Sequence, residues 1–444
     1  MSGRGGLFTL AAAVLVAVSL ELLANAVLRT SDRVFDFYAS YAQLRARYGP
    51  PMTLPHPEIG YVTGPGFERG ANRHNRAGFR GNEIRDVSPR TWRVATLGGS
   101  TTYSGGVDDH RDAYPHLLEQ TLQAHFPECD VQVINGGVPG YTTHHSLLNW
   151  RHRVSKFAPQ LVIVYHGVND LSARLVWPAP NHHADYRGVF VSYRNPAIYA
   201  YWENLAVLRI PAIRLGLITS HNSAERHYEF GSSFVRLELH QQLVEGRYPD
   251  GLFRTVPLAR MLRENDGSHF LSNIEALVVD VQRTGSEVLL VSFAAAPRPG
   301  TVLALPELRE ALNVQNRHLR PLADALNVDL LDLASTLSGD DSLFVDGVHF
   351  NAAGNARRAD LISQALHARA PDCGQSALNA EPASADRGQR NTRQSSGNPE
   401  GVAASPGRRI AHRIRSRYAN TPPASSGSAN IRKLAVIEKP PAIR

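Results

Sequence analysis

Short apolar runs alternate with amphipathic stretches between residues 93 and 366. The runs rich in β-branched and aliphatic residues predict five strands, at Arg93–Leu97, Val131–Asn135, Leu161–Tyr165, Val288–Phe293 and Val328–Leu333. Apolar residues at helical spacing predict helices around residues 114–126, 147–157, 274–281, 308–326 and 352–366. Strands that alternate with helices are typical of a parallel sheet with helices on both faces. The sequence therefore predicts an α/β fold around a five-stranded parallel sheet.

The spacing between the third and fourth predicted strands is unusually long. About 120 residues separate them, whereas one crossover helix would suffice. The extra chain, about residues 175–270, includes Trp177-Pro178 and the aromatic group Tyr199-Ala200-Tyr201-Trp202. We expect this insertion to form a lid over the carboxyl edge of the sheet. The alternative is a set of extra helices packed to one side.

The first 30 residues contain a long apolar stretch. Gly5 to Leu28 carries one charged residue, Glu21, and reaches the ~20 residues that span a bilayer. We expect a transmembrane signal anchor here. A cleaved signal peptide is the first alternative, since Ala24-Asn25-Ala26 fits a small-x-small cleavage pattern, and a buried soluble helix is the second. Residues 31–90 form a lead-in segment before the first strand of the sheet.

The net charge of +7 belongs to the C-terminal end of the chain. Of 47 basic and 40 acidic residues, 12 basic and 5 acidic ones lie from Pro371 onward, so the preceding part is balanced at 35 of each. Residues 373–444 are rich in Arg, Ser, Pro and Gly and poor in large apolar residues, which predicts a disordered basic tail. The tail could adhere weakly to anionic lipid or polysaccharide. Nucleic-acid binding is not expected, because no recognition fold accompanies the charge.

Small and polar residues follow the predicted strands. These segments are Gly98-Gly99-Ser100, Gly136-Gly137-Val138-Pro139-Gly140, His166-Gly167-Val168-Asn169-Asp170 and, before the last helix, Asp346-Gly347-Val348-His349. The carboxyl ends of parallel strands form the edge where α/β sheets bind ligands. We therefore expect these four segments to meet at one site.

These residue types fit acyl transfer by a serine. Ser100 is the expected nucleophile, His349 its general base, and Asp346 the acceptor that holds the His349 ring. The oxyanion hole would consist of the backbone N–H groups of Ser100 and Gly140 and the side-chain amide of Asn169. Gly136 and Gly137 compete with Gly140 for its role. Of the neighbouring residues, Asp170 is expected to orient its loop, and His166 either lines the pocket or makes a structural hydrogen bond.

In this order the four segments resemble the SGNH (GDSL-type) hydrolase family of exported or membrane-anchored bacterial enzymes. Ser100, Gly140 and Asn169 match its first three blocks, Asp346 and His349 match the last, and the resemblance covers roughly residues 91 to 370 of a hydrolase domain at 91–372. The upstream Asn75–Gly81 segment also looks like the lead-in of exported members. One departure is the Gly-Gly-Ser of block one, which lacks the usual Asp before the serine.

The resemblance implies a flavodoxin-like three-layer sandwich and an esterase or lipase that uses neither metal nor cofactor. Its substrates would be carboxylic esters of lipids or acetylated glycans. Two alternatives stay open, namely an O-acetyltransferase acting on a cell-surface glycan and a non-catalytic anchored binding module. The catalytic domain would be exported, to the periplasm or cell surface, and the oligomeric state is open. The pairs His144-His145 and His182-His183 lack partner carboxylates or thiols at ligand spacing, so we expect solvated faces rather than metal sites.

The fold that the resemblance implies places the two cysteines near each other. Cys129 lies between the first helix and the second strand, and Cys373 follows the last helix. In flavodoxin-like windings these two helices share a face, and both positions lie away from the active-site edge. A disulfide between Cys129 and Cys373 is therefore a hypothesis for an exported protein.

Overall fold

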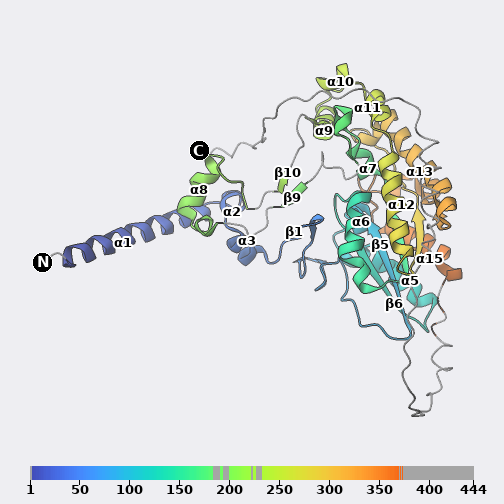
Figure 1. Cartoon of the computed structure of the whole chain (residues 1–444), viewed down its shortest axis with the longest axis horizontal. Helices are drawn as coiled ribbons and strands as arrows, with labels where there is room; N and C mark the ends of the chain where they lie inside the picture. The colour runs from blue at the N-terminus through green and yellow to red at the C-terminus, as the bar shows by residue number, and fades with distance from the viewer. Residues whose placement is uncertain are drawn as a thin grey trace, which may run out of the picture. The chain divides into compact units, whose positions relative to one another are not determined.

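The central sheet is parallel throughout, and its strand order is β13-β12-β7-β5-β6. The computed structural model (Figure 1) describes residues 3–183, 191–193, 200–221, 224–226 and 233–369, together with Pro371 and Cys373. The five strands are β5 (Thr91–Gly98), β6 (Asp130–Gly137), β7 (Leu161–Tyr165), β12 (Glu287–Val291) and β13 (Asp329–Leu331). This confirms the predicted flavodoxin-like sheet, with each strand within a few residues of its expected position. Apart from Cys373, the predicted tail lies outside the described residues.

Helices cover both faces of the sheet, as Figure 1 shows. On one face, α5 (Tyr114–His125) and α15 (Ala352–Leu366) pack against each other and against the strands. On the other face lie α6 (Thr143–His152), α12 (Ser268–Gln282) and the C-terminal part of α13 (Pro306–Leu326). Alternate residues of β5 serve the two faces: Trp92 and Val94 belong to the first core cluster, Ala95 and Leu97 to the second. Burial of β5 on both sides explains why apolar residues occur on both of its faces.

Strand register brings the loops of the three central strands to one edge. Gly98 at the end of β5 pairs with Gly137 of β6 and with Tyr165 of β7. The chain leaves β5 into the short helix α4 (Ser100–Tyr103) and leaves β7 into α7 (Val168–Ala173). The expected site residues that follow these strands therefore lie at the same edge of the sheet.

The N-terminal part of the chain starts with one long apolar helix. Helix α1 (Gly3–Leu28) contains a segment, Phe8–Leu28, with a mean hydropathy of 2.2, and that segment is long and apolar enough to cross a membrane. Two short helices follow, and then two antiparallel hairpins; these elements are α2 (Asp32–Tyr38), α3 (Tyr41–Tyr48), β1 (Thr53–His56), β2 (Gly60–Thr63), β3 (Glu68–Arg69) and β4 (Asn72–Arg73).

The insertion between β7 and β12 divides into parts with different partners. Its later helices pack into the core on one face of the central sheet, which for this part matches the alternative of extra helices packed to one side. An earlier segment, residues 200–221, contacts α1, α2 and α3 instead. The elements are β8 (Val176–Trp177), β9 (Val191–Tyr193), a 3-10 turn at Tyr201–Asn204, α8 (Ala206–Arg214), β10 (Ala224–Arg226), β11 (Ser233–Phe234), α9 (Val235–Val244), α10 (Leu252–Thr255) and α11 (Leu258–Glu264). Coverage of the Ser100 edge by a lid stays a prediction.

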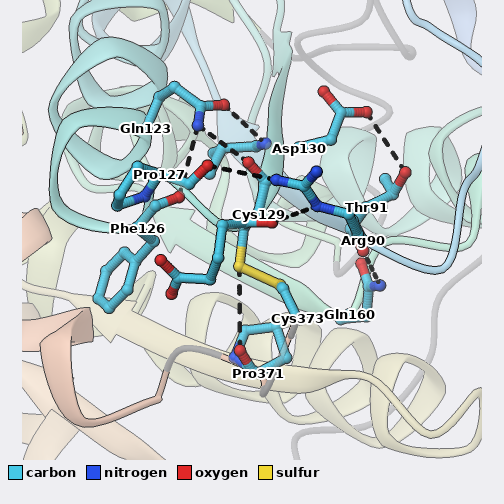
Figure 2. Close-up of a disulfide and its surroundings, with 12 residues drawn as sticks. Arg90, Thr91, Gln123, Phe126, Pro127, Cys129, Asp130, Gln160, Pro371 and Cys373 are labelled. Atoms are coloured by element: carbon cyan, nitrogen blue, oxygen red, sulfur yellow. Dashed lines mark hydrogen bonds between the residues drawn. A yellow bond between two sulfur atoms is a disulfide. The ribbon is translucent and has the colours of Figure 1, made fainter. Parts of the chain in front are cut away.

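Cys129 and Cys373 form a disulfide, with Cα atoms 5.2 Å apart (Figure 2). Cys129 lies between α5 and β6, and Cys373 follows α15, so the bond joins the ends of two helices that share a face. This confirms the expected pairing. The bond closes a loop across 244 positions and fastens the chain that follows α15 to the start of β6.

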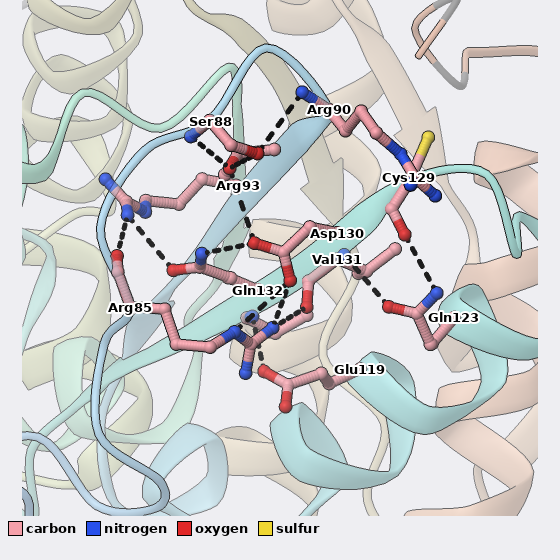
Figure 3. Close-up of polar contacts among 12 residues, drawn as sticks. Arg85, Ser88, Arg90, Arg93, Glu119, Gln123, Cys129, Asp130, Val131 and Gln132 are labelled. Carbon is pink, nitrogen blue, oxygen red and sulfur yellow. Dashed lines mark hydrogen bonds and ion pairs between the residues drawn. The ribbon is translucent and has the colours of Figure 1, made fainter. Parts of the chain in front are cut away.

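A polar network occupies the amino ends of β5 and β6, opposite the catalytic edge (Figure 3). Buried Arg93 donates hydrogen bonds to the carbonyl oxygens of Phe157 (2.6 Å) and Arg85 (2.6 Å) and to Gln132 Oε1 (3.0 Å). Arg85 in turn donates to Asp130 Oδ1 at 2.7 Å. The network fixes the segment that enters β5, because Arg93 joins the Arg85 and Phe157 carbonyls to the Gln132 side chain.

Candidate active site

Ser100, His349 and Asp346 form a continuous chain of hydrogen bonds. His349 Nε2 lies 2.7 Å from Ser100 Oγ, and His349 Nδ1 lies 2.7 Å from Asp346 Oδ2. An ionised carboxylate only accepts, so the ring proton belongs on Nδ1, and Nε2 is left to accept from the serine hydroxyl. This is the geometry that a nucleophile, its base and an orienting acid require.

The Asp346 carboxylate is held by its own loop. Its Oδ1 accepts hydrogen bonds from the backbone N–H groups of Val348 (3.1 Å) and His349 (2.9 Å). Burial opposes ionisation of this carboxyl, but the hydrogen bonds from the His349 ring and from the two backbone groups outweigh burial and lower the pKa of Asp346 to about 2. Asp346 is therefore a carboxylate at any physiological pH.

Arg298 fastens the segment that leads into this loop and that begins with a 3-10 turn at Asp341–Leu343. Its guanidinium donates to the carbonyl oxygens of Asp341 (2.8 Å), Phe344 (2.9 Å) and Val345 (2.6 Å). Three carbonyls on one planar group fix both the position and the direction of the chain just before Asp346. Arg298 acts here as a positioning residue.

Ser100 lies at a crowded turn between β5 and α4. A side chain at Gly98 would place its Cβ 2.5 Å from the Tyr165 carbonyl oxygen, and one at Gly99 would place it 2.4 Å from Asn169 Nδ2. Both positions therefore require glycine. The close approach brings the Asn169 amide beside the residue that precedes Ser100.

Two buried arginines, one before α4 in the sequence and one far after it, donate hydrogen bonds to the backbone of α4. Arg80, from the lead-in segment, donates to the carbonyl oxygens of Tyr103 (2.8 Å) and Ser104 (2.7 Å). Arg358, from α15, donates through Nη2 to the carbonyl oxygen of Thr101 at 3.0 Å. Carbonyls at the end of a one-turn helix have no intrahelical donor, and these guanidinium groups supply it.

The Asn169 amide lies in the region expected for the oxyanion hole. Its Nδ2 donates to the Tyr141 carbonyl oxygen at 2.9 Å and lies against Gly99. Gly140, one residue before Tyr141, has φ +84° and an exposed backbone. Gly136 and Gly137 are buried residues of β6, where a Cβ would meet the Thr96 carbonyl and the Tyr103 nitrogen respectively. This geometry favours Gly140 for the block-two role.

Asp170 and His166 are buried behind the site. Asp170 Oδ1 accepts from the backbone N–H (2.9 Å) and the hydroxyl (2.6 Å) of Thr143, so it fastens the start of α6 to the Asn169 loop. His166 Nε2 lies 2.8 Å from Ser146 Oγ, which is a structural contact. Asp170 therefore orients its loop as expected, and His166 follows the second of its two alternatives.

The expectation of solvated histidine pairs was wrong for His145. This residue is buried, its ring stacks on Tyr141, and its Nδ1 lies 2.8 Å from Thr142 Oγ1. Burial lowers the pKa of His145 to about 3, so the ring is neutral. Its contacts make it part of the support of the Gly140–Tyr141 turn, a function that residue type alone does not indicate.

The sequence-based argument missed Arg80, Arg298 and Arg358 as supports of the site. For Arg358 a signal was present, because Gly354, Ile362 and Leu366 lie at four-residue spacing from it on the buried face of α15. A lone arginine in an apolar stripe indicates a buried charge with a specific partner. Arg80 lies within the Asn75–Gly81 segment, where only the family resemblance drew attention to it.

Comparison with known proteins bears on the chemistry of this site. No curated protein matches the chain significantly. The sequence model described as the GDSL-like lipase/acylhydrolase family matches residues 96–357, more than half of the 444-residue chain. The protein belongs to this family. As a GDSL-like acylhydrolase it is an ester-cleaving hydrolase, and the matched range contains the five residues described above as the expected site.

Several solved structures are similar to this GDSL-like hydrolase. A G-D-S-L family lipolytic protein from Desulfitobacterium hafniense is 13% identical with a TM-score of 0.34, over 62% of this chain and 98% of that one. A lipase/acylhydrolase from Enterococcus faecalis is 18% identical with a TM-score of 0.34, over 62% and 96%. An acetyl xylan esterase from Geobacillus stearothermophilus is 14% identical with a TM-score of 0.35, over 61% and 93%.

Proposed function

We propose that this GDSL-like hydrolase is a serine esterase that uses Ser100, His349 and Asp346 as its catalytic triad. One observation carries the proposal, namely the unbroken hydrogen-bond chain from Asp346 through His349 to Ser100, with both links at 2.7 Å. A site that had lost its activity would be under no constraint to keep this chain, so the chain also argues against a purely binding function.

In the acylation step, Ser100 Oγ attacks the ester carbonyl carbon while His349 Nε2 accepts the hydroxyl proton. The positive charge that forms on the ring lies against the Asp346 carboxylate. The tetrahedral intermediate collapses when the C–O bond to the alcohol breaks and His349 returns the proton to the leaving oxygen. Water then attacks the acyl-serine with His349 again as base, which releases the acid and restores Ser100.

The oxyanion of each tetrahedral intermediate would be held by three N–H donors. These are the backbone N–H groups of Ser100 and Gly140 and the Asn169 amide. Their support is the packing of Asn169 against Gly99 and the exposed, left-handed backbone of Gly140. Donors that are in place before the reaction stabilise developing charge without reorganisation.

The substrate we propose is an acetyl or short acyl ester on a lipid or a glycan. The side chains of His349 and Asp346 are 24% and 51% exposed, so the reacting groups are accessible to water and to a bulky substrate from solvent. Open access to water favours hydrolysis over transfer to a glycan hydroxyl. An assay with an acetyl donor and added glycan separates the two by product, because a transferase forms an acetylated glycan while an esterase forms free acetate.

We also propose that α1 holds the enzyme at a membrane, with the hydrolase domain exported. The support is the length and hydropathy of Phe8–Leu28 and the disulfide, a bond typical of oxidising compartments. A cleaved and secreted form remains the competing hypothesis, and mass determination of the mature N-terminus distinguishes the two.

The test of the proposed chemistry is labelling by a fluorophosphonate, which reacts with activated serines. We expect one label on Ser100, and we expect Ser100→Ala to abolish both labelling and hydrolysis of p-nitrophenyl acetate. Ser272→Ala is the matched control, since Ser272 is an exposed serine of α12. Full hydrolysis by Ser100→Ala, or a label on another serine, would refute the proposal.

A further inference from the structure

The single charged residue of the apolar segment Phe8–Leu28 caps a helix of the insertion. The Glu21 carboxylate accepts hydrogen bonds from the backbone N–H groups of Ala206 (2.9 Å) and Val207 (3.0 Å), at the start of α8. Asn25 Nδ2 also donates to Glu21 Oε1 at 2.7 Å. A carboxylate at this position satisfies N–H groups that have no partner within the helix and complements the helix dipole. Glu21 thus joins α1 to a segment about 185 residues away in the sequence.

More polar groups are enclosed where residues 200–221 meet α2 and α3. Arg209 is completely buried and donates to the Tyr38 carbonyl (2.8 Å), the Glu203 carbonyl (2.7 Å) and Gln43 Oε1 (3.0 Å). His221 Nε2 lies 3.0 Å from Glu203 Oε2, and both side chains are buried. Glu203, Arg209 and His221 therefore point inward, toward one another, whereas Asn204, Arg214 and Thr219 of this segment are exposed.

The same segment also exposes several large apolar side chains. Tyr201, Leu215 and Leu217 are 87%, 73% and 72% exposed. Outside α1, six of the ten exposed large apolar side chains of the described residues fall in this short stretch, and they are Tyr201, Trp202, Leu205, Leu208, Leu215 and Leu217. A concentration of this kind on a surface marks contact with a partner or a membrane.

The position of α8 along α1 indicates that this surface contacts a membrane rather than a partner protein. The apolar contacts between the two helices involve the C-terminal turns of α1, where Ala24 and Leu28 pack with Ile210 and Ile213 of α8, and Figure 1 draws α8 beside this end of α1. A helix crosses the ~30 Å hydrocarbon layer in ~20 residues, so these turns reach the boundary between hydrocarbon and headgroups. Tyr and Trp prefer that boundary, and a helix with an apolar outer face lies in it.

We propose that residues 200–221 form a second membrane contact, which lies in the lipid interface beside the exit of α1 and is fastened to it through Glu21. The occupant of the exposed apolar face is the bilayer. The inference rests on the proposed anchoring by α1 and extends it, since cleavage after Ala26 would remove Glu21 and leave the α8 N-terminus without its cap. The insertion is thus part of the anchor.

The proposal can be tested with single-cysteine variants of the full chain reconstituted in phosphatidylcholine vesicles. The two native cysteines are paired, so an introduced cysteine provides one thiol for an environment-sensitive fluorophore. Leu215→Cys and Leu217→Cys test the face, and Leu15→Cys in α1 tests the anchor. Val87→Cys and Val244→Cys are matched controls, since these side chains are 68% and 67% exposed outside the segment.

We expect doxyl-labelled lipid to quench the labels at 215 and 217 at least threefold more than the control labels, and aqueous iodide to quench them less. If the label at 15 is in lipid while those at 215 and 217 respond like the controls, the anchor stands and this proposal falls. If the label at 15 also responds like the controls, the anchoring itself fails. Protection from both quenchers that grows with protein concentration would mean that a second copy covers the face, which also overturns the proposal.

A second variant tests the fastening through Glu21. Glu21→Gln removes the charge that caps α8 while its amide keeps one acceptor, so we expect lipid quenching at 217 to fall and that at 15 to stay unchanged. Unchanged quenching at both positions would show that Glu21 does not hold the segment in the interface.

Discussion

Arg358, on the buried face of α15, donates a hydrogen bond to the carbonyl oxygen of Thr101, the residue that follows Ser100, the proposed nucleophile. The same guanidinium stacks on the Tyr114 ring at 3.7 Å from its centroid and donates to Asn355 Oδ1 at 2.8 Å. Burial lowers the pKa of Arg358, and the nearby ring systems and acceptors offset that cost. A buried cation thus connects the helix after His349 with the helix that begins at Ser100.

Replacement of Arg358 by lysine should destabilise the protein and weaken activity together. Lysine keeps the charge but loses the planar fork and the ring stacking, so we expect the free energy of unfolding to fall by about 1–3 kcal/mol. Arg357→Lys is the matched control, since Arg357 is the exposed neighbour on the same helix, and its effect should stay within about 0.5 kcal/mol. Urea denaturation followed by circular dichroism measures the free energy of unfolding of both variants. Equal effects of the two variants would contradict this assignment.

Asn169→Ala should lower kcat by about 10²–10³ and leave KM nearly unchanged, because a donor to the developing oxyanion acts mainly in the transition state. Steady-state hydrolysis of p-nitrophenyl acetate provides both constants. Asn204→Ala is the control, since Asn204 is exposed and its side chain donates to the nearby Tyr201 carbonyl oxygen. A KM effect without a kcat effect would assign Asn169 to substrate binding instead.

Gly99→Ala should impair catalysis through Asn169. The new Cβ would lie 2.4 Å from Asn169 Nδ2 and 3.0 Å from the Tyr141 carbonyl oxygen, so the amide must move. A displacement of about 1 Å at a catalytic group costs roughly 10²-fold in rate. The double variant Gly99→Ala/Asn169→Ala should be no slower than Asn169→Ala alone, because both changes act on one group. Additive losses in this cycle would show that Gly99 matters for another reason.

Asp346→Asn should reduce kcat by about 10²–10⁴, because the amide no longer stabilises the protonated ring or fixes its tautomer. The pKa of Asp346 is lowered to about 2 in the folded protein, against about 3.9 in an unfolded chain. A lowered pKa contributes stability that is present above pH 4 and is lost as the pH falls toward 2. The difference in melting temperature between wild type and variant should therefore be larger at pH 6 than at pH 3. A difference that grows as the pH falls would contradict a lowered pKa of Asp346.

Removal of the disulfide should lower stability without changing the chemistry. Because Cys129–Cys373 closes a long loop, we expect Cys129→Ser/Cys373→Ser to lose about 2–4 kcal/mol of the free energy of unfolding. The bond lies away from the catalytic edge, so kcat on a short acyl ester should be unchanged. Dithiothreitol should lower the melting temperature of the wild type toward that of the double serine variant and leave the variant unaffected.

Local patterns were sufficient for the sheet and for the residues of the candidate site. The three central strands β5, β7 and β12 are almost fully buried because helices cover both of their faces, which favours apolar residues in them. The edge strand β13 is only partly buried. Since parallel strands end at one edge, the order of Ser100, Gly140, Asn169 and His349 along the chain predicted that these residues would converge. The Cys129–Cys373 pairing was inferred in the same way, from two helices on one face.

The supports of the site depend on partners that local patterns do not specify. Arg80, Arg298 and Arg358 bind backbone carbonyls. Because every residue type has a carbonyl, the sequence does not indicate which residues accept hydrogen bonds from these arginines. His145 was expected to be solvated because no carboxylate or thiol lies at ligand spacing from the histidine pair, yet the ring is buried against Tyr141. Only the packing of α6 behind the Gly140 turn reveals its role.

By itself, the sequence determined the parallel α/β fold, the apolar N-terminal helix and the serine, histidine and carboxylate at the sheet edge, because periodicity and strand order are properties of neighbouring residues. The tertiary structure decided what holds that edge together and where the insertion goes. In the sequence, Glu21 is only the one charged residue of a long apolar stretch. In the folded chain, the N–H groups of Ala206 and Val207 lie beside its carboxylate and donate hydrogen bonds to it. Contacts between residues so distant along the chain arise from folding, which is why composition and spacing did not reveal them.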